Sequence, residues 1–236
     1  MPKKRRHRPQ RQLPTRVEPR EGGGLALLVG GVTQSVSAER AHDGYWGMML
    51  PPSCPDNALL LGLGGATVAH LLSARCPDTR IVGVERDAAV LALARASFGL
   101  DTLAHLRIVE GDAFAWVAAQ FVDERQTLAE GAKQYDLICV DLFEAGRLTA
   151  GVLATQFLRQ VAALLTPEGV ASFNLMITGR TPEQLHRLRR VFSIEREQRL
   201  GGNVVVHVKP LSLSDDLAKN EQEIHPASFE ARKLRE

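Results

Sequence analysis

Three acidic residues each follow an apolar run of the sequence, and together they could bind one ligand. Glu85 ends the run VGVE, Asp112 follows IVEG, and Asp141 ends LICVD. A carboxylate can accept hydrogen bonds from ribose hydroxyls or an adenine amine, and it can hold an amine and take its proton. Any one of them could instead cap a helix or lie in solvent. Their repeated position at the end of an apolar run favours a shared binding site.

A glycine-rich turn precedes these acids and indicates a nucleoside ligand. The apolar residues 58–61 end at the turn GLGG (62–65), and a helix-compatible segment follows. In a parallel sheet such a turn lies at the carboxyl end of a strand, where the N–H groups of the next helix point at the ligand. Glu85 follows Gly64 at the offset of about 20 residues where an acid accepts from ribose hydroxyls. Thr67 stands where the dinucleotide fingerprint has its third glycine, so an ordinary strand-to-helix turn remains an alternative.

The turn and the acids require a regular framework of alternating elements. The pattern predicts strands at 58–61, 80–85, 106–110, 135–141, 170–176, 194–200 and 203–208, with helices at 67–74, 88–98, 113–122, 149–165 and 182–192. This alternation predicts an α/β fold, a Rossmann-like, doubly wound, mostly parallel seven-stranded sheet. Gly201-Gly202 joins the last two strands as a hairpin, so the last strand is expected to be antiparallel. Residues 24–37 predict a short β-hairpin before the sheet.

Charge and composition divide the chain into a body and two tails. The first 20 residues carry eight lysines and arginines against Glu18 alone, so this segment has a charge of +7 and the rest has −5. We expect a disordered basic tail over 1–22, a short β segment over 23–52, the ligand-binding domain over 53–210 and a polar tail over 211–236. An acidic body disfavours nucleic acid as a partner, apart from weak contact through the basic tail. No apolar run approaches the ~20 residues that span a bilayer, so no membrane partner is expected.

The cysteines bear on the compartment. Cys54, Cys76 and Cys139 are an odd number without CxxC spacing, which argues against a disulfide framework and against a zinc site. They fit a reducing cytoplasm, which is the predicted localisation. The histidines are interpreted as structural, and no metal is invoked.

The glycine turn and the acidic motifs together resemble a known family. The series GLGG, VGVERD, EGDAFAW and YDLICVDLFE is similar to the class I S-adenosylmethionine-dependent transferases, and within them to the spermidine synthase (polyamine aminopropyltransferase) family. The segment LLVGGVTQS…DGYWGMM is similar to the stretch that precedes the core in this family, with Gln34, Tyr45 and Met48 at matching positions. The resemblance extends from about Leu25 to Lys209.

The resemblance implies roles for individual residues and a co-substrate, S-adenosylmethionine or its decarboxylated form. Asp141 matches the catalytic aspartate that holds the attacking amine and helps to take its proton, and Glu144 keeps an acid three residues later. Tyr45 and Phe143 are candidates, beside Asp141, for contact with the acceptor. The implied co-substrate-binding residues are Gly62, Gly64 and Gly65 facing the nucleoside and its sulfonium chain, Glu85 at the ribose, Asp112 with Ala113 at the adenine, and also Gln34.

Departures from the family pattern decide between three functions. Ala66 stands where the family has an aspartate that holds the terminal amine of the aminopropyl donor. We therefore expect a transferase that moves a methyl group to a small or amine-bearing acceptor. The alternatives are a polyamine aminopropyltransferase that uses decarboxylated S-adenosylmethionine, and a catalytically silent nucleoside-binding or scaffold module. The family commonly forms homodimers partly through its N-terminal β-domain, which is short here, so the oligomeric state stays open.

Overall fold

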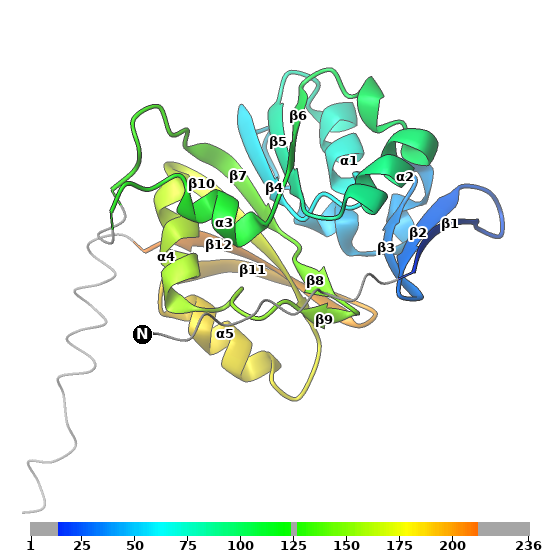
Figure 1. Ribbon diagram of the computed structural model, residues 1–236. Coiled ribbons are helices and arrows are strands. Elements are labelled where there is room, and N and C mark those ends of the chain that lie inside the picture. Colours follow the sequence, from blue (N-terminus) through cyan, green and yellow to red (C-terminus); the bar gives the residue numbers. More distant parts are fainter. Residues whose placement is uncertain (1–13, 124–126, 212–236) are drawn as a thin grey trace, which may run out of the picture.

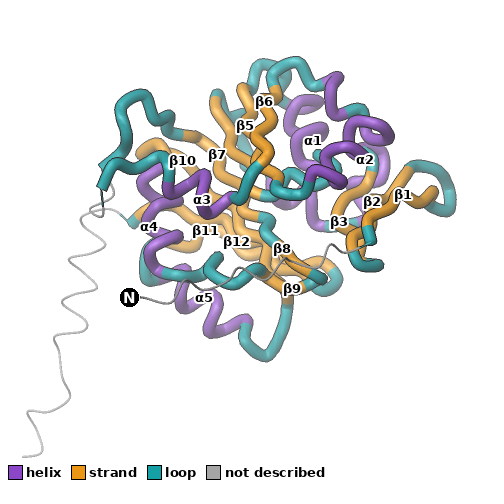
Figure 2. The backbone as a smooth tube through the Cα atoms, in the orientation of Figure 1, coloured by secondary structure: helices purple, strands orange, loops and turns teal. Residues whose placement is uncertain are grey.

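The computed structural model describes residues 14–123 and 127–211, and a seven-stranded sheet forms its centre (Figures 1 and 2). The strand order is β11-β12-β10-β7-β4-β5-β6, and β12 runs antiparallel to both of its neighbours while the other pairs are parallel. The predicted mostly parallel sheet with an antiparallel last strand is therefore confirmed. The strands are β4 (Asn57–Leu61), β5 (Arg80–Glu85), β6 (Leu106–Glu110), β7 (Tyr135–Val140), β10 (Leu165–Met176), β11 (Phe192–Leu200) and β12 (Asn203–Pro210).

Helices cover both faces of this sheet, because alternate residues of each strand point to opposite faces. On β4, Leu59 and Leu61 belong to the apolar cluster that includes α3, α4 and α5, whereas Ala58 and Leu60 belong to the cluster that includes α1 and α2. The sheet is thus buried on both sides, as the continuous apolar run of β4 requires. The helices are α1 (Thr67–Arg75), α2 (Ala88–Phe98), α3 (Ala113–Ala118), α4 (Thr155–Leu164) and α5 (Thr181–Arg189).

The N-terminal β segment is larger than the predicted hairpin. It is a three-stranded antiparallel sheet of β1 (Thr15–Pro19), β2 (Leu25–Val29) and β3 (Val32–Val36). The prediction of disorder over 1–22 is therefore wrong for β1, which pairs with β2 along its whole length. Residues 1–13 and nearly all of the predicted C-terminal tail lie outside the described part of the chain.

Two short 3₁₀ helices, η1 (Ala38–Asp43) and η2 (Tyr45–Met49), connect the small sheet to the core. The small sheet packs against α2, where Leu27 is buried with Val90 and Phe98. Two side chains also fasten the end of β3 to the glycine turn and α1: the Ser35 hydroxyl accepts from the Gly65 N–H at 2.7 Å, and the Thr67 hydroxyl bonds Val36. These contacts hold the small sheet at the mouth of the predicted ligand site.

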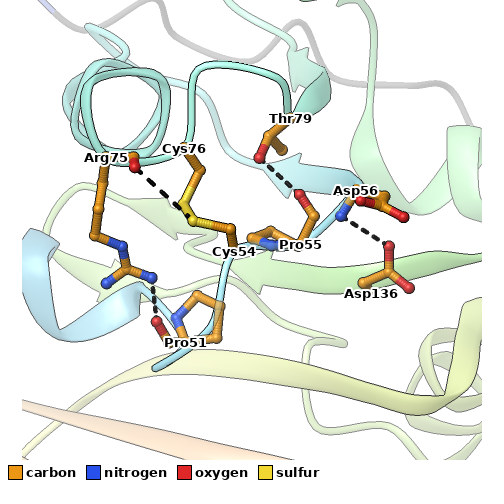
Figure 3. Close-up of a disulfide and its surroundings, with 8 residues drawn as sticks. All are labelled: Pro51, Cys54, Pro55, Asp56, Arg75, Cys76, Thr79 and Asp136. Atoms are coloured by element: carbon orange, nitrogen blue, oxygen red, sulfur yellow. Dashed lines mark hydrogen bonds between the residues drawn. A yellow bond between two sulfur atoms is a disulfide. The ribbon is translucent and has the colours of Figure 1, made fainter.

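A disulfide joins Cys54 to Cys76, so the prediction against a disulfide is wrong (Figure 3). Cys54 lies in the loop before β4, and Cys76 directly follows α1. The two half-cystines are far apart in the sequence but their Cα atoms are 5.5 Å apart, within the range that a disulfide spans. Cys139 is free and buried. The cysteine argument for a reducing compartment is therefore lost, and the cytoplasm stays a prediction.

A second difference is the segment after β7, which was predicted to enter a helix at residue 149. It first forms a two-residue hairpin of β8 (Phe143–Glu144) and β9 (Arg147–Leu148), and the helix α4 begins only at Thr155. Ala145 and Gly146 at its tip both have positive φ angles, as a tight hairpin turn of this kind requires. No helix within the described ranges is long and apolar enough to cross a membrane.

Candidate active site

A cavity of about 1190 Å³ opens where the strands β4, β5, β6 and β7 end. It exceeds the roughly 300–1,000 Å³ of common ligand pockets, so it has room for a nucleoside and a second small molecule. A smaller cavity of about 610 Å³, at the other end of the sheet, contains none of the predicted site residues. The larger cavity is lined by nine of them, namely Gln34, Gly62, Gly64, Glu85, Asp112, Ala113, Asp141, Phe143 and Glu144.

The glycine turn brings the end of β4 against the end of β7. Gly62 has a φ of +89°, and a Cβ atom there would lie 2.2 Å from the Asp141 carbonyl oxygen. Only glycine tolerates both this backbone conformation and this approach. The Asp141 N–H donates to the Leu61 carbonyl at 2.9 Å and extends the pairing of the two strands. The turn and the predicted catalytic carboxylate are therefore fixed relative to each other.

Glu85 connects the end of β5 to the same turn. One carboxylate oxygen accepts from the Gly64 N–H at 2.9 Å, and the other accepts from the Asp87 N–H at 3.0 Å. Burial raises the pKa of Glu85, and these N–H groups act in the opposite direction. The carboxylate thus lies beside the glycine turn, where a ribose bound on the turn would reach it. Gly65, by contrast, is not among the residues that line the cavity, and its N–H donates to Ser35.

Asp112 has the capping role that the sequence left open. Its carboxylate accepts from the Ala115 N–H at 2.9 Å, at the start of α3. The side chain also lines the cavity and is exposed, and Ala113 beside it is buried. Because a carboxylate oxygen accepts more than one hydrogen bond, capping leaves room for an adenine amine. Recognition of adenine by this pair stays a prediction.

Asp141 is held by two neutral donors where the cavity meets the end of β7. The Tyr45 hydroxyl donates to one carboxylate oxygen at 2.8 Å, and the Asn174 amide donates to the other at 2.8 Å. The Asn203 amide in turn donates to the Asn174 oxygen at 2.9 Å. Tyr45 lies on η2 outside the cavity lining, so it reaches the site through Asp141. Tyr45 of η2 and Asn174 of β10 thus orient the carboxylate, and Asn203 of β12 orients Asn174.

The electrostatics of Asp141 suit proton transfer near neutral pH. Burial raises its pKa from 3.8 to about 6, while the hydrogen bonds from Asn174 and Tyr45 oppose the shift. The pKa of Tyr45 is also raised, first by burial and then by the nearby Asp141 carboxylate, so the phenol remains a donor. Asp141 is only partly covered in surface area, which leaves it accessible from the cavity. A general base works best when its pKa lies near the working pH.

Glu144 has a different partner from Asp141. It is exposed on β8, and one of its oxygens is 3.6 Å from a guanidinium nitrogen of Arg86, which directly follows β5. Leu142 and the half-buried Phe143, which stand between the two acids in the sequence, also line the cavity. A catalytic role for Glu144 stays a prediction.

Sequence reasoning missed Asn174, Asn203, Ser35 and Arg86 as parts of the site. Asn174 and Ser35 are buried polar residues within strands, and such residues need hydrogen-bond partners. That signal marks a buried network but does not name its partners. Arg86 directly follows the acid Glu85, and its pairing with Glu144 depends on the unpredicted hairpin.

Known proteins with similar sequences are transferases of two kinds. The chain is 32% identical over 127 residues to a probable polyamine aminopropyl transferase of Bifidobacterium longum, which covers 52% of this chain and 26% of the relative. It is 30% identical over 130 residues to the eEF1A lysine and N-terminal methyltransferase of Danio rerio, and this match covers 52% of this chain and 18% of the relative. This chain thus matches about a quarter or less of either relative. No protein-family model matches the sequence.

Among solved structures, a probable spermidine synthase from Corynebacterium glutamicum superposes with a TM-score of 0.62 at 17% identity. The match covers 83% of this chain and 76% of that chain. It confirms the Rossmann-like fold with its mostly parallel seven-stranded sheet. The curated relatives, polyamine aminopropyltransferases and eEF1A methyltransferases, are transferases of the kind that the sequence motifs resemble.

Proposed function

We propose that the protein binds S-adenosylmethionine and transfers its methyl group to a small or amine-bearing acceptor. The observation that carries the proposal is the Asp141 carboxylate, held by Tyr45 and Asn174 in the cavity that also contains the glycine turn and Glu85. In this assignment Glu85 binds the ribose hydroxyls, and the sulfonium lies between the glycine turn and Asp141. The acidic lining suits a sulfonium cation, because opposite charges attract strongly in a partly dehydrated cavity.

The reaction that these residues support is a direct displacement. The lone pair of the acceptor nitrogen forms the new N–C bond, the S–C bond breaks, and its electron pair stays on the sulfur of S-adenosylhomocysteine. The nitrogen proton passes to the Asp141 carboxylate. The lone pairs that Tyr45 and Asn174 leave free on Asp141 can accept this proton. Asp141 thereby orients the amine and raises the fraction that has a lone pair for attack.

Ala66 supports methyl transfer over aminopropyl transfer. The residue precedes α1, is fully buried and has a φ of +65°. A methyl side chain there offers no charge to the terminal ammonium of a decarboxylated donor. Loss of such a charge-assisted contact typically costs roughly 1.5–3 kcal/mol. The aminopropyltransferase remains the second candidate, because polyamine aminopropyltransferases are among the relatives.

The test is methyl transfer from methyl-labelled S-adenosylmethionine to a panel of small primary amines, with S-adenosylhomocysteine as the measured product. We expect turnover with the native protein and near-complete loss in Asp141→Asn, with donor affinity largely kept. Asp101→Asn, an exposed aspartate outside the cavity lining, is the control and should keep full turnover. Unchanged turnover in Asp141→Asn would remove the proposed base. Tight donor binding with no turnover on any amine would favour the silent module.

Two predictions concern partners other than the donor and the acceptor. The basic residues 1–13 lie outside the described part of the chain, so weak contact of the tail with nucleic acid stays a prediction. The oligomeric state, for which the resemblance implies a homodimer, stays open.

A further inference from the structure

The acceptor end of the cavity has two acids, and they differ in their partners. Among the described residues that line the cavity, Asp141 and Glu144 lie on the wall that follows β7, whereas Glu85, Asp87 and Asp112 follow β5 and β6. The last two cap α2 and α3. Among the described residues, the Asp141 carboxylate accepts hydrogen bonds only from the neutral side chains of Tyr45 and Asn174. Glu144, in contrast, faces the guanidinium of Arg86 at 3.6 Å. The two acids therefore offer different sites to a cation.

Asp141 is the natural position for one ammonium group. Its carboxylate is buried enough to raise its pKa, and the ion pairs recorded for the described residues give it no cation. A buried carboxylate without a counter-charge is costly, and an opposite charge nearby favours its ionised form. A bound amine would supply that charge.

The wall beyond Asp141 lacks a free acid for a second ammonium. Leu142 and Phe143 present apolar side chains to the cavity, and the next acid, Glu144, is paired with Arg86 at 3.6 Å in a partly exposed ion pair. Arg86 itself lines the cavity and places a positive charge on the path of a second cation. A like charge at that point disfavours a diamine, whereas an apolar chain would pack against Leu142 and Phe143.

We propose that the acceptor is an amine with a single positive charge on an apolar body, and that Arg86 excludes diamines and polyamines by occupying Glu144. This inference rests on the proposed transferase function and names the substrate class of its cavity. Arg86 is a specificity-determining residue here, because it acts on the far end of the acceptor through Glu144.

The test compares hexylamine with 1,6-diaminohexane, which have the same chain length and differ by one ammonium group. Each is titrated by calorimetry into protein saturated with S-adenosylhomocysteine, so binding is read without turnover. We expect the native protein to bind hexylamine roughly tenfold more tightly than the diamine. Arg86→Gln should free Glu144 and bring the two affinities together or reverse their order. The double variant Arg86→Gln/Glu144→Gln should restore the preference for hexylamine.

Arg95→Gln is the matched control, because Arg95 is an exposed arginine of α2 that pairs with Asp101 outside the cavity lining. It removes the same charge and should leave the ratio of affinities unchanged. The proposal is overturned if the native protein binds the diamine as well as hexylamine, if it binds neither, or if Arg86→Gln leaves the ratio as it was. Failure of S-adenosylhomocysteine to bind at all would instead refute the proposed function.

Discussion

At the scale of single residues, the site depends on two carboxylates whose environments differ. Glu85 accepts from backbone N–H groups of the glycine turn and its own strand end, whereas Asp141 accepts from two side chains, Tyr45 of η2 and Asn174 of β10. The first arrangement suits a fixed binding group. The second suits a group that changes its protonation state during reaction, since its donors can adjust to the charge.

Removal of the Glu85 side chain should weaken the binding of the donor. In Glu85→Ala the ribose hydroxyls lose their acceptor, and the Gly64 N–H loses its partner, so the Kd for S-adenosylmethionine should rise at least about tenfold. Glu110→Ala is the control, because Glu110 ends the neighbouring strand β6 and lies outside the cavity lining. Equal dissociation constants for native protein and Glu85→Ala would refute the ribose assignment.

The pKa of Asp141 predicts the acid limb of the pH profile. Because the carboxylate is the active form and its pKa is raised to about 6, kcat/KM should fall about tenfold per pH unit below pH 6. A profile of kcat/KM from pH 4.5 to 8.5 measures this limb. An acid limb with its midpoint near pH 4 would show that a carboxyl of ordinary pKa controls the rate.

The same shift has a consequence for stability, and its sign is opposite to that of a salt-bridged acid. The folded pKa lies above the unfolded value of 3.8, so the folded state binds the proton more tightly between about pH 4 and pH 6. The contribution of this group to the free energy of unfolding therefore falls as pH rises through that window. In urea titrations Asp141→Asn should lose this contribution, so its stability relative to the native protein should increase from pH 4 to pH 7. If the difference in the free energy of unfolding between Asp141→Asn and the native protein stays constant from pH 4 to pH 7, the raised pKa of Asp141 is contradicted.

At the scale of elements, the disulfide closes a covalent ring that contains the glycine turn. The half-cystines are separated by 22 positions, and the ring includes β4, the glycine turn and α1. Cys54 also belongs to the segment that leads from Tyr45 on η2 to β4. Pro51 lies in the same segment, and its carbonyl accepts a hydrogen bond from the side chain of Arg75 at the end of α1 (Figure 3). The ring therefore fastens the start of the core to the end of its first helix.

Reduction of this disulfide should destabilise the protein. Opening a ring of this size increases the entropy of the unfolded chain and should lower the free energy of unfolding by roughly 3 kcal/mol. Thermal melts with and without dithiothreitol measure the loss of Tm. The Cys54→Ser variant should melt at the lower temperature in both conditions, since it has no disulfide to reduce. If the Tm of the native protein is the same with and without dithiothreitol, the disulfide contributes no stability.

The sequence predicted the elements whose signals are local. The strands β5 and β6 and the helix α2 have the predicted bounds, because apolar periodicity and the Asp87 cap mark their ends. The strand β1 and the hairpin β8–β9 were missed, because both are stabilised by pairing with neighbours. The same limit applied to the site: Asp141 was identified at its strand end, but Asn174 gains its role only because β10 lies beside β7.

At the scale of the whole molecule, the fold gathers these groups at one edge of the sheet. The parallel strands β4, β5, β6 and β7 end at this edge, and the small N-terminal sheet closes it through Ser35. In open α/β sheets ligands bind outside the carboxyl ends of the strands. The glycine turn and Glu85 follow from this arrangement, whereas the part of the cavity next to Asp141 is also lined by residues of η2 and of the β8–β9 hairpin.

The central claim is that this cavity binds S-adenosylmethionine as a methyl donor. Calorimetric titration of the purified protein with S-adenosylmethionine and, separately, with its decarboxylated form tests the claim most directly. The account predicts saturable binding of both through Glu85 and the glycine turn, with tighter binding of S-adenosylmethionine, since Ala66 offers no charge to the decarboxylated donor. Tighter binding of the decarboxylated form would establish the aminopropyl donor instead, and binding of neither would contradict the nucleoside site itself.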